Sequence, residues 1–357
     1  MMNRQPVVIT GMGVICSVGL NVKEFWESLA AGKSGIDTIT RFDVSNFPAK
    51  VAAEVKNFKP EDYMDAKTVG RTSWAAQMAI AATKEAMESA RLDMSKENKE
   101  RVGVVVATML DQDYLIHGSE VLGGKGPIMV DPLFIMKGSP HSVSQEVSSL
   151  VGGTGPSTSV NSVCASGGDA IGVALNFIRL GYADVMVAGG SDSNIAPLGL
   201  YVLWRVGALT KEADPAKAGR PFDLNRSGFV CGEGAGVVVL ETLEHAQRRG
   251  APILAEVAGV GWSFDAGSVT APTPEPQALA MQVALKNAGV TPEEVDYINP
   301  HGPGTRLNDS CETRAVKLAF GERAYKIPMS STKSMHEADL INSIKLGLAA
   351  VAEEIKI

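Results

Sequence analysis

The 357-residue sequence contains few cysteines, few histidines and no long run of like charge. Its four cysteines are far apart and form no C-x-x-C pair, so neither a disulfide framework nor a zinc site is expected. The net charge is −7, and charges of one sign never occur five in succession. This charge pattern argues against a protein that binds nucleic acid or a membrane surface.

Long hydrophobic segments are missing as well. The longest apolar stretches are short and interrupted by glycine, as in residues 102–107, and residues 1–9 contain no signal-peptide core. We therefore expect no membrane span and no targeting segment, and we predict a cytoplasmic protein. Because 45% of the residues are hydrophobic and only 20% are charged, the chain can bury a large core.

Glycine, by contrast, is abundant: its 37 residues stand singly or in pairs at the ends of apolar segments. Runs rich in β-branched residues alternate with alanine-rich stretches, which predicts an α/β fold with sheets buried on both faces. The expected strands are 6–10, 101–107, 184–188, 236–240 and 253–259, and the expected helices include 73–90 and 277–288. Gly11, Gly13 and the glycines of 232–236 match no nucleotide-binding loop, so we interpret them as tight-turn residues.

The chain contains two similar segments. A helix that ends near Asp93 leads into the strand at 102–107, and a helix that ends near Val290 leads into a strand at 295–299. This similarity favours an internal duplication of one α/β unit, although any two helix–loop–strand units share the pattern. No linker rich in proline or serine separates the halves, so we expect them to pack as one body.

The stretch 157–169 is the most informative one for chemistry. It begins with β-prone residues, changes to small residues at Cys164, and is followed by a helical pattern that ends at Gly181. A thiol at a strand-to-helix turn meets the positive end of the helix dipole and unpaired N–H groups, which favour a thiolate and bind an oxyanion. Cys164 is therefore a candidate nucleophile for a thioester or ester, and a small core residue is the alternative. The core interpretation applies to the other three cysteines: Cys16, Cys231 and Cys311.

Three further candidates follow two short apolar segments. His301 comes just after the predicted strand 295–299, in a turn of glycine and proline. Polar residues at the carboxyl ends of strands are where sites form in α/β folds, although a solvated turn histidine would have the same sequence. Lys333 and His336 follow the apolar start at Ile327 in the same way, and a surface Lys–His pair is the alternative.

Several of these segments together resemble the β-ketoacyl-acyl carrier protein synthases, of the elongating type II kind. Their order and spacing agree with that family from about residue 6 to residue 335. The segments are 8–14, 163–167, 188–191, 220–223, 228–236, 299–302 and 330–334, which read VITGMGV, VCASG, AGGS, RPFD, GFVCGEGAG, NPHG and SSTKS.

The resemblance implies a thiolase-like α/β fold of five layers, αβαβα, built from two duplicated halves. Residues 1–250 would form the first half, with the nucleophile and the dimer and cap insertions, and residues 251–357 the second half, which is shortened. It also implies a decarboxylative Claisen condensation between an acyl thioester and malonyl-acyl carrier protein, usually in a homodimer. No metal, nucleotide or other free cofactor is needed, because the phosphopantetheine arrives on the carrier protein.

The same resemblance gives each site residue an expected role. Cys164 accepts the acyl group, and its own N–H helps to hold the oxyanion. His301 donates to the malonyl thioester carbonyl during decarboxylation, and Lys333 supports the site. The expected substrate-binding residues are Thr305, which bonds the pantetheine arm, together with Phe229 and Gly302. The acidic carrier protein is expected to dock on basic residues: Lys67, Arg71 and Arg205.

The sequence departs from the family pattern mainly near its C-terminal end. The second family histidine is expected five residues after the lysine, where this chain has Ala338, so His336 is the candidate for that role. Pro303 replaces a pantetheine-binding hydroxyl residue, and the chain stops at Ile357, before the expected Gly-Phe-Gly-Gly loop. Residues 109–112 replace a glycine-rich stretch, which predicts an altered chain-length preference.

Three alternatives to an ordinary synthase therefore stay open. The first is a truncated or non-condensing subunit that binds carrier protein. The second is a partial catalyst that accepts acyl groups on Cys164 without malonyl turnover. The third is a chain whose residues 337–357 are foreign, through a frameshift or an early stop. The retained Cys164 argues against a purely structural role.

Overall fold

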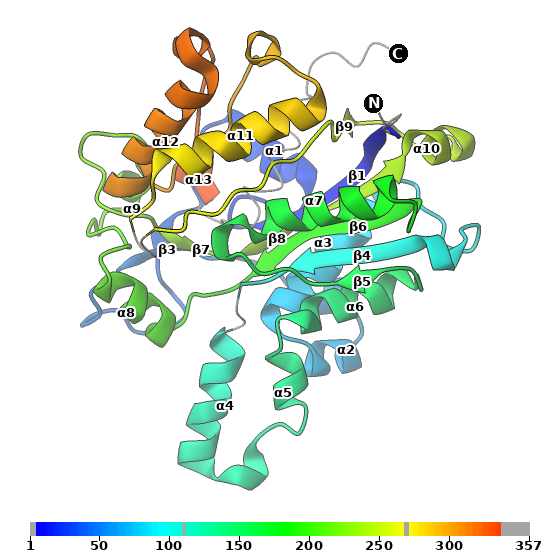
Figure 1. Ribbon diagram of the computed structural model, residues 1–357. Helices are drawn as coiled ribbons and strands as arrows, with labels where there is room; N and C mark the ends of the chain where they lie inside the picture. The colour runs from blue at the N-terminus through cyan, green and yellow to red at the C-terminus, as the bar shows by residue number, and fades with distance from the viewer. Residues whose placement is uncertain (1–4, 110–111, 268–270, 337–357) are drawn as a thin grey trace.

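A six-stranded mixed sheet forms the centre of the computed structural model, which describes residues 5–109, 112–267 and 271–336 (Figure 1). The strand order is β5-β4-β6-β8-β1-β9. These strands are β1 (Val7–Cys16), β4 (Val102–Ala107), β5 (Ser157–Thr158), β6 (Val185–Asp192), β8 (Gly234–Thr242) and β9 (Ala255–Glu256). β4 runs parallel to β5 and β6, whereas β8 is antiparallel to β6 and β1. Each of the five strands predicted up to residue 259 is present, and the predicted α/β class is confirmed.

Helices cover both faces of this sheet. α3 (Trp74–Ser89) and α6 (His141–Val151) pack on one face and α7 (Ser166–Arg179) packs on the other, as Figure 1 shows. α3 begins where the Ser73 side chain accepts a hydrogen bond from the N–H of Ala76, so the predicted helix 73–90 is confirmed. A separate cluster of buried apolar residues fills each side of the sheet, which explains why β4 and β8 are buried along their whole length.

The tight-turn interpretation of Gly11 and Gly13 is wrong. Both lie inside β1, where a Cβ would stand 2.2 Å from the Ala86 carbonyl oxygen and 2.0 Å from the Ala82 carbonyl oxygen, respectively. These positions need glycine because the backbone of α3 crosses the strand with almost no space between them. The same interpretation is wrong for the glycines of 232–236, because Gly232 ends β7 (Cys231–Gly232) and Gly234 and Gly236 lie in β8. Among these glycines only Gly234 has a positive φ, of +152°.

The remaining elements surround the main sheet. A small sheet contains β2 (Asp37–Thr38), β3 (Val51–Ala53) and β7 (Cys231–Gly232). The other helices are α1 (Val22–Ala30), α2 (Ala66–Arg71), α4 (Gln112–Lys125), α5 (Phe134–Lys137), α8 (Pro197–Arg205), α9 (Pro215–Ala218), α10 (Leu243–Arg249), α11 (Pro274–Ala288), α12 (Arg306–Phe320) and α13 (Lys333–His336). Figure 1 shows α4 and α5 as a hairpin that projects from the body.

The second half of the chain lies on the α7 side of the sheet, where α11 and α12 pack against each other (Figure 1). Its predicted strand 253–259 is reduced to β9, which joins the sheet of the first half beside β1. The predicted strand 295–299 makes one parallel bridge, between Ile298 and Met329. Within the described residues, the second half therefore has helices and paired segments but no large sheet of its own. Residues 337–357, on which part of the sequence interpretation depends, lie outside them.

Three general expectations can be compared with the described residues. No helix among them is both long and apolar enough to span a membrane. No group of three His, Cys, Asp or Glu side chains in these ranges is arranged to hold a metal ion. Cys16, Cys231 and Cys311 are buried, as predicted for core residues, and none of the four cysteines forms a disulfide bond with another described residue.

Candidate active site

The predicted nucleophile lies on a strained turn. A β-run as far as Cys164 was expected and is wrong, because β5 ends at Thr158 and the chain reaches α7 through a single 3-10 turn that contains Cys164. Val163 has φ +56°, a left-handed conformation that is rare for a β-branched residue. The turn is held on both sides, since the Val163 N–H donates to Asn161 Oδ1 (3.2 Å) and the Ser166 hydroxyl donates to the Val163 carbonyl (2.6 Å). Strain of this kind is typical of functional sites.

Cys164 itself is half-buried and lies two residues before α7, whose N-cap is Ala165. It therefore lies at the positive end of the helix dipole, where N–H groups without a partner in the helix stabilise a thiolate or an oxyanion. α7 ends at Arg179, and Gly181 follows with φ +79°, so the predicted stop signal is confirmed. The expected strand is thus shorter than predicted, but the position of Cys164 at the start of a helix is as predicted.

His301 and Lys333 lie together, although 32 residues separate them. The Lys333 ammonium donates a hydrogen bond to the His301 carbonyl oxygen. The Ile298–Met329 bridge holds the two segments side by side, and the Tyr297 hydroxyl reinforces it with a hydrogen bond to the Ser330 carbonyl (2.9 Å). Two motifs that are separate in the sequence thus form one site.

Glu312 on α12 completes this cluster, and our sequence interpretation missed it. Its carboxylate accepts hydrogen bonds from the N–H groups of His301 (2.6 Å) and Gly302 (2.8 Å). Burial raises the pKa of Glu312, while these two donors and the Lys333 charge oppose the rise. Lys333 is 1% exposed and Glu312 is 6% exposed, so both charges are buried, and both bind the backbone of the loop that carries His301.

Asp309, one turn earlier on α12, joins this loop to a distant segment. Its carboxylate accepts hydrogen bonds from the N–H groups of Phe222 (2.7 Å) and Gly304 (3.2 Å), and it forms an ion pair with Arg226 (3.4 Å). Burial raises the pKa of Asp309, against the Phe222 hydrogen bond and the Arg226 charge. Asp309 and Glu312 could have been found from the sequence, because acids three residues apart share one helix face.

The residues expected to bind substrate also have structural contacts. Thr305 is the N-cap of α12, and its side chain accepts a hydrogen bond from the Asn308 N–H (3.2 Å), which leaves its hydroxyl proton able to donate. Gly302 is buried with φ +36°, and a Cβ there would lie 2.7 Å from the Phe222 ring. Phe229 is half-buried and packs against the apolar cluster beneath α8.

His336, the candidate second histidine, is completely buried on α13. Its Nε2 lies 3.3 Å from the Thr332 hydroxyl, and its ring meets Phe25 edge-on with the centroids 6.0 Å apart. α13 is also tied to the first half, because the Gly35 N–H donates to the Met335 carbonyl (2.8 Å). Ala338, where the family histidine was expected, lies outside the described residues.

The three basic residues expected to dock a carrier protein do not form one patch. Lys67 and Arg71 lie on α2, whereas Arg205 ends α8, and the two helices are well separated in Figure 1. Arg71 is paired with Glu146 through contacts of 3.0 and 2.9 Å. Lys67 and Arg205 are exposed and form no ion pair with any described residue.

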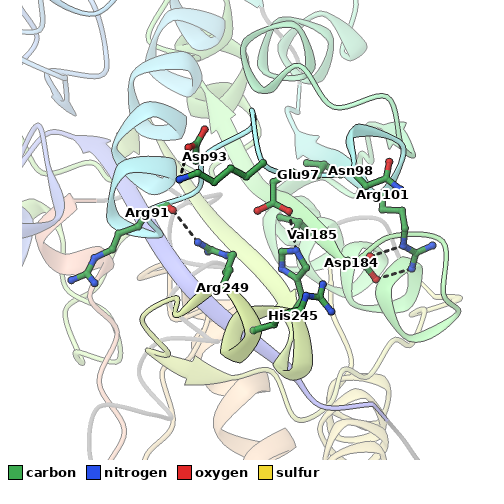
Figure 2. A pocket seen from close by; sticks show the side chains of 12 residues that line it. Arg91, Asp93, Glu97, Asn98, Arg101, Asp184, Val185, His245 and Arg249 are labelled. Carbon is green, nitrogen blue, oxygen red and sulfur yellow. Dashed lines mark hydrogen bonds and ion pairs between the residues drawn. The ribbon is translucent and has the colours of Figure 1, made fainter.

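A charged cavity of about 370 Å³ lies at the amino-terminal ends of the parallel strands β4 and β6 (Figure 2). It adjoins Val102 and Val185, the first residues of β4 and β6, whereas Cys164 follows the carboxyl end of the parallel strand β5. Figure 2 shows the side chains of Glu97 and His245 pointing toward each other in it. No residue predicted for the site lines this cavity, so it is separate from the candidate active site.

The mixed α/β fold, in which His301 and Lys333 lie together, is that of a thiolase-like ketosynthase. Two family models match the chain: the N-terminal domain of β-ketoacyl synthase over residues 4–246 and its C-terminal domain over residues 254–340. The chain therefore belongs to the β-ketoacyl synthase family, a class of condensing acyltransferases, and the resemblance stated from the sequence is confirmed.

Curated relatives agree with this assignment. The chain is 41% identical over 338 residues to 3-oxoacyl-[acyl-carrier-protein] synthase 2 of Coxiella burnetii. This alignment covers 94% of this chain and 82% of the relative. It is 41% identical over 339 residues to the protein of the same name from Vibrio cholerae, with the same coverage.

Solved structures of ketosynthases share the fold. The ishigamide ketosynthase/chain length factor matches with a TM-score of 0.88 and 35% identity, covering 97% of this chain and 86% of that one. A type II polyketide ketosynthase solved with its acyl carrier protein matches with a TM-score of 0.87 and 32% identity over 97% and 86% of the two chains. A β-ketoacyl synthase from Burkholderia phymatum gives 0.84 and 32%, over 93% and 81%. The predicted thiolase-like fold is thus confirmed.

Proposed function

We propose that this protein is an elongating β-ketoacyl-acyl carrier protein synthase that uses Cys164 as its nucleophile. The substrate assignment follows the curated relatives, which are named 3-oxoacyl-[acyl-carrier-protein] synthase 2. The observation that carries the proposal is the position of Cys164, a half-buried thiol on a strained turn at the start of α7. Synthases of this family use no free cofactor, because the phosphopantetheine comes with the carrier protein.

In the first half-reaction, the Cys164 thiolate attacks the thioester carbonyl of an acyl-carrier protein. The tetrahedral oxyanion forms near the N-terminal end of α7, where backbone N–H groups stabilise it. Its collapse breaks the bond to the pantetheine sulfur, so that the carrier leaves as a free thiol and the acyl group stays on Cys164. The role of the structure in this step is to keep the thiol at the helix end.

In the second half-reaction, malonyl-carrier protein loses carbon dioxide and the resulting enolate attacks the acyl carbonyl on Cys164. We assign the His301 ring to stabilise the enolate oxygen, since His301 lies on a loop that Lys333 and Glu312 hold rigid. The new carbon–carbon bond forms as the thioester bond to Cys164 breaks, which regenerates the thiolate. His336 remains the candidate for a second donor, and Thr305, Phe229 and Gly302 remain candidates for substrate contacts.

The partner of this reaction is an acyl carrier protein. A structural relative was solved as a ketosynthase in complex with its acyl-carrier protein, which supports this partner. Lys67 and Arg205 are the candidate docking cations, because both are exposed, whereas the charge of Arg71 is shared with Glu146. We place the reaction in the cytoplasm, in keeping with four cysteines that form no disulfide bond.

We further propose that the protein is a homodimer. β5 is an edge strand of the main sheet, so it can pair with the same strand of a second copy. The α4–α5 hairpin exposes Ile128 (92%) and Ile135 (83%), which is unusual for a surface that stays in water. We also propose that the chain divides into two halves, residues 1–250 and 251–357. The two family matches support this boundary, because the first ends at residue 246 and the second begins at residue 254.

The test is intact-protein mass spectrometry of the wild type and Cys164→Ala after incubation with an acyl-carrier protein, followed by malonyl-carrier protein. We expect an acyl mass on the wild type alone, and its discharge by malonyl with release of a β-ketoacyl product. Absence of acylation on the wild type would refute the proposed nucleophile.

One observation favours a second candidate, an acyl-accepting protein without malonyl turnover. His336 is completely buried, and its ring contacts Thr332 and Phe25. This placement does not favour His336 as the second histidine that donates to the enolate in a synthase. In the same experiment, this candidate predicts acylation of Cys164 that malonyl-carrier protein fails to discharge.

A further inference from the structure

We propose that Asp169 is a positioning residue for Cys164, and that it acts by tying the nucleophile turn to Trp262. The three side chains involved, Ser162, Asp169 and Trp262, are called the clasp below. The inference rests on the proposed function, because it concerns the reactivity of Cys164. Asp169 lies in the first turn of α7, five residues after the nucleophile.

Each carboxylate oxygen of Asp169 has its own hydrogen-bond donor. The Ser162 hydroxyl donates to Oδ2, and the Trp262 Nε1–H donates to Oδ1 at 2.7 Å. Ser162 stands two residues before Cys164, and its own N–H donates to the Ser166 hydroxyl oxygen at 2.7 Å. The backbone that enters the nucleophile turn is therefore held by the helix that leaves it, and Asp169 is the side chain that completes this closure.

The shape of α7 supports the same contact independently. Gly172 follows Asp169 by three residues, so the two positions share one face of the helix. A Cβ at Gly172 would lie only 2.4 Å from Cζ2 of the Trp262 ring. Gly172 thus leaves room for the indole while Asp169 binds its N–H, and both features fit one placement of Trp262.

Through Trp262 the clasp connects the two halves of the chain, because Trp262 belongs to the segment matched by the C-terminal domain of the family. Asp169 and Ser162 belong to the N-terminal domain. A second tie lies at the far end of α7, where Arg179 donates to the carbonyl of Ala258 (2.9 Å). The clasp therefore connects the two halves at the nucleophile end of α7, and Arg179 connects them at the other end, where it provides a matched control.

A carboxylate near a thiolate has two effects of opposite sign. As a bare negative charge it disfavours the thiolate and slows reactions that need it. As a clasp it keeps the thiol at the N–H groups of α7, which favours the thiolate and its attack. Since both oxygens of Asp169 accept hydrogen bonds, we infer that the second effect is the larger one, and the two effects predict opposite results when the carboxylate is removed.

The experiment measures two reactions of Cys164 in the full-length protein. The first is alkylation by iodoacetamide between about pH 5 and about pH 9, followed by mass spectrometry, which reports the thiolate without any carrier protein. The second is the rate of acyl transfer from acyl-carrier protein, with kcat and KM determined separately. The variants are Asp169→Ala, which removes the carboxylate, and Gly172→Ala, which displaces the indole and keeps the charge. Arg179→Ala is the control.

We expect Asp169→Ala and Gly172→Ala to slow both alkylation near pH 7 and kcat for acyl transfer by about tenfold, because a small misplacement of a nucleophile has effects of this size. KM for the carrier protein should not change, since Lys67 and Arg205 are on other elements. Arg179→Ala should lower the melting temperature and leave both rates of Cys164 as in the wild type.

Faster alkylation in Asp169→Ala, together with an unchanged rate in Gly172→Ala, would show that Asp169 is only a nearby charge and would overturn the proposal. If Gly172→Ala does not fold, Trp262→Phe makes the same distinction, because it removes the N–H donor, keeps an aromatic ring and leaves the Asp169 charge in place. A wild type that is alkylated but never acylated would refute the proposed function, and the alkylation series would still decide the role of the clasp.

Discussion

Single buried charges hold the candidate site in place. Glu312 binds the backbone of His301 and Gly302, and Lys333 binds the His301 carbonyl. Neither side chain needs to touch a substrate to matter, because together they set the direction in which the His301 ring leaves its loop. The roles of Glu312 and Lys333 should therefore be visible in the malonyl step and not in the loading of Cys164.

Glu312→Gln tests this division of labour. Glutamine keeps one acceptor oxygen but turns an NH2 group toward the second N–H donor and removes the charge opposite Lys333. We expect discharge of acyl-Cys164 by malonyl-carrier protein to slow on the order of 100-fold, with the acylation rate unchanged. Rapid-quench mass spectrometry measures both rates, and a wild-type discharge rate would contradict the role assigned to Glu312.

A second set of buried charges lies far from the site, beside the cavity in Figure 2. His245 contacts Glu241 through Nδ1 (2.7 Å) and Glu97 through Nε2 (2.9 Å). The hydrogen bond to Glu241 raises the pKa of His245, against the effect of burial. Burial would raise the pKa of Glu241, but hydrogen bonds from Arg249, His245 and Thr10 outweigh it and lower that pKa to about 2.

These shifts predict a stability that falls at both ends of the pH range. His245 stabilises the fold fully below its ordinary pKa of 6.5, and this contribution is lost as the pH rises through the raised value. Glu241 contributes above its ordinary pKa of 4.5 and loses this contribution as the pH falls toward about 2. Urea unfolding should show an alkaline loss on the order of 1 kcal/mol in the wild type that His245→Gln lacks. Equal alkaline slopes in both proteins would contradict the assignment.

At the scale of elements, the first half of the chain depends on a close crossing of α3 over β1. The Cβ of an alanine at position 13 would lie 2.0 Å from the Ala82 carbonyl oxygen, so Gly13→Ala must push helix and strand apart. We expect a loss of about 3 kcal/mol or more in the free energy of unfolding, measured with urea.

The matched control for this substitution is Gly70→Ala. Gly70 lies in α2, and a Cβ there would meet no atom within 4 Å. Because alanine favours a helix over glycine, we expect this variant to gain up to about 1 kcal/mol. A similar loss in the two variants would mean that the close crossing is not the cause.

At the scale of the whole molecule, the α4–α5 hairpin decides the oligomeric state in our proposal. We expect the double variant Ile128→Asp and Ile135→Asp to be monomeric, because both apolar side chains become charged at the proposed interface. Sedimentation equilibrium measures the mass. Leu318→Asp is the control, since this leucine is exposed on α12, which lies far from the hairpin in Figure 1, and it should stay dimeric. A monomeric wild type would refute the dimer.

Much of the fold could be predicted because local rules and the fold agree. The β-branched runs became strands and the alanine-rich run at 73–90 became α3, since each pattern matches the period of its element. The glycines of β1 misled the prediction because a local sequence does not show which helix will cross a strand. The β-prone residues before Cys164 misled it because Ser166 and Asn161 hold a turn there in place of a strand.

The sequence by itself determined the candidate residues of the site: a thiol at the start of a helix, a histidine after a short apolar segment and a lysine in a second motif. These are local patterns, and the family match confirmed the class of enzyme that they indicated. Only the tertiary structure decided which charges support them, since Glu312 meets His301 and Asp169 meets Trp262 across gaps in the sequence. Contacts of that kind depend on how α7 and α12 are placed against distant segments, which packing of the whole chain fixes and no local pattern encodes.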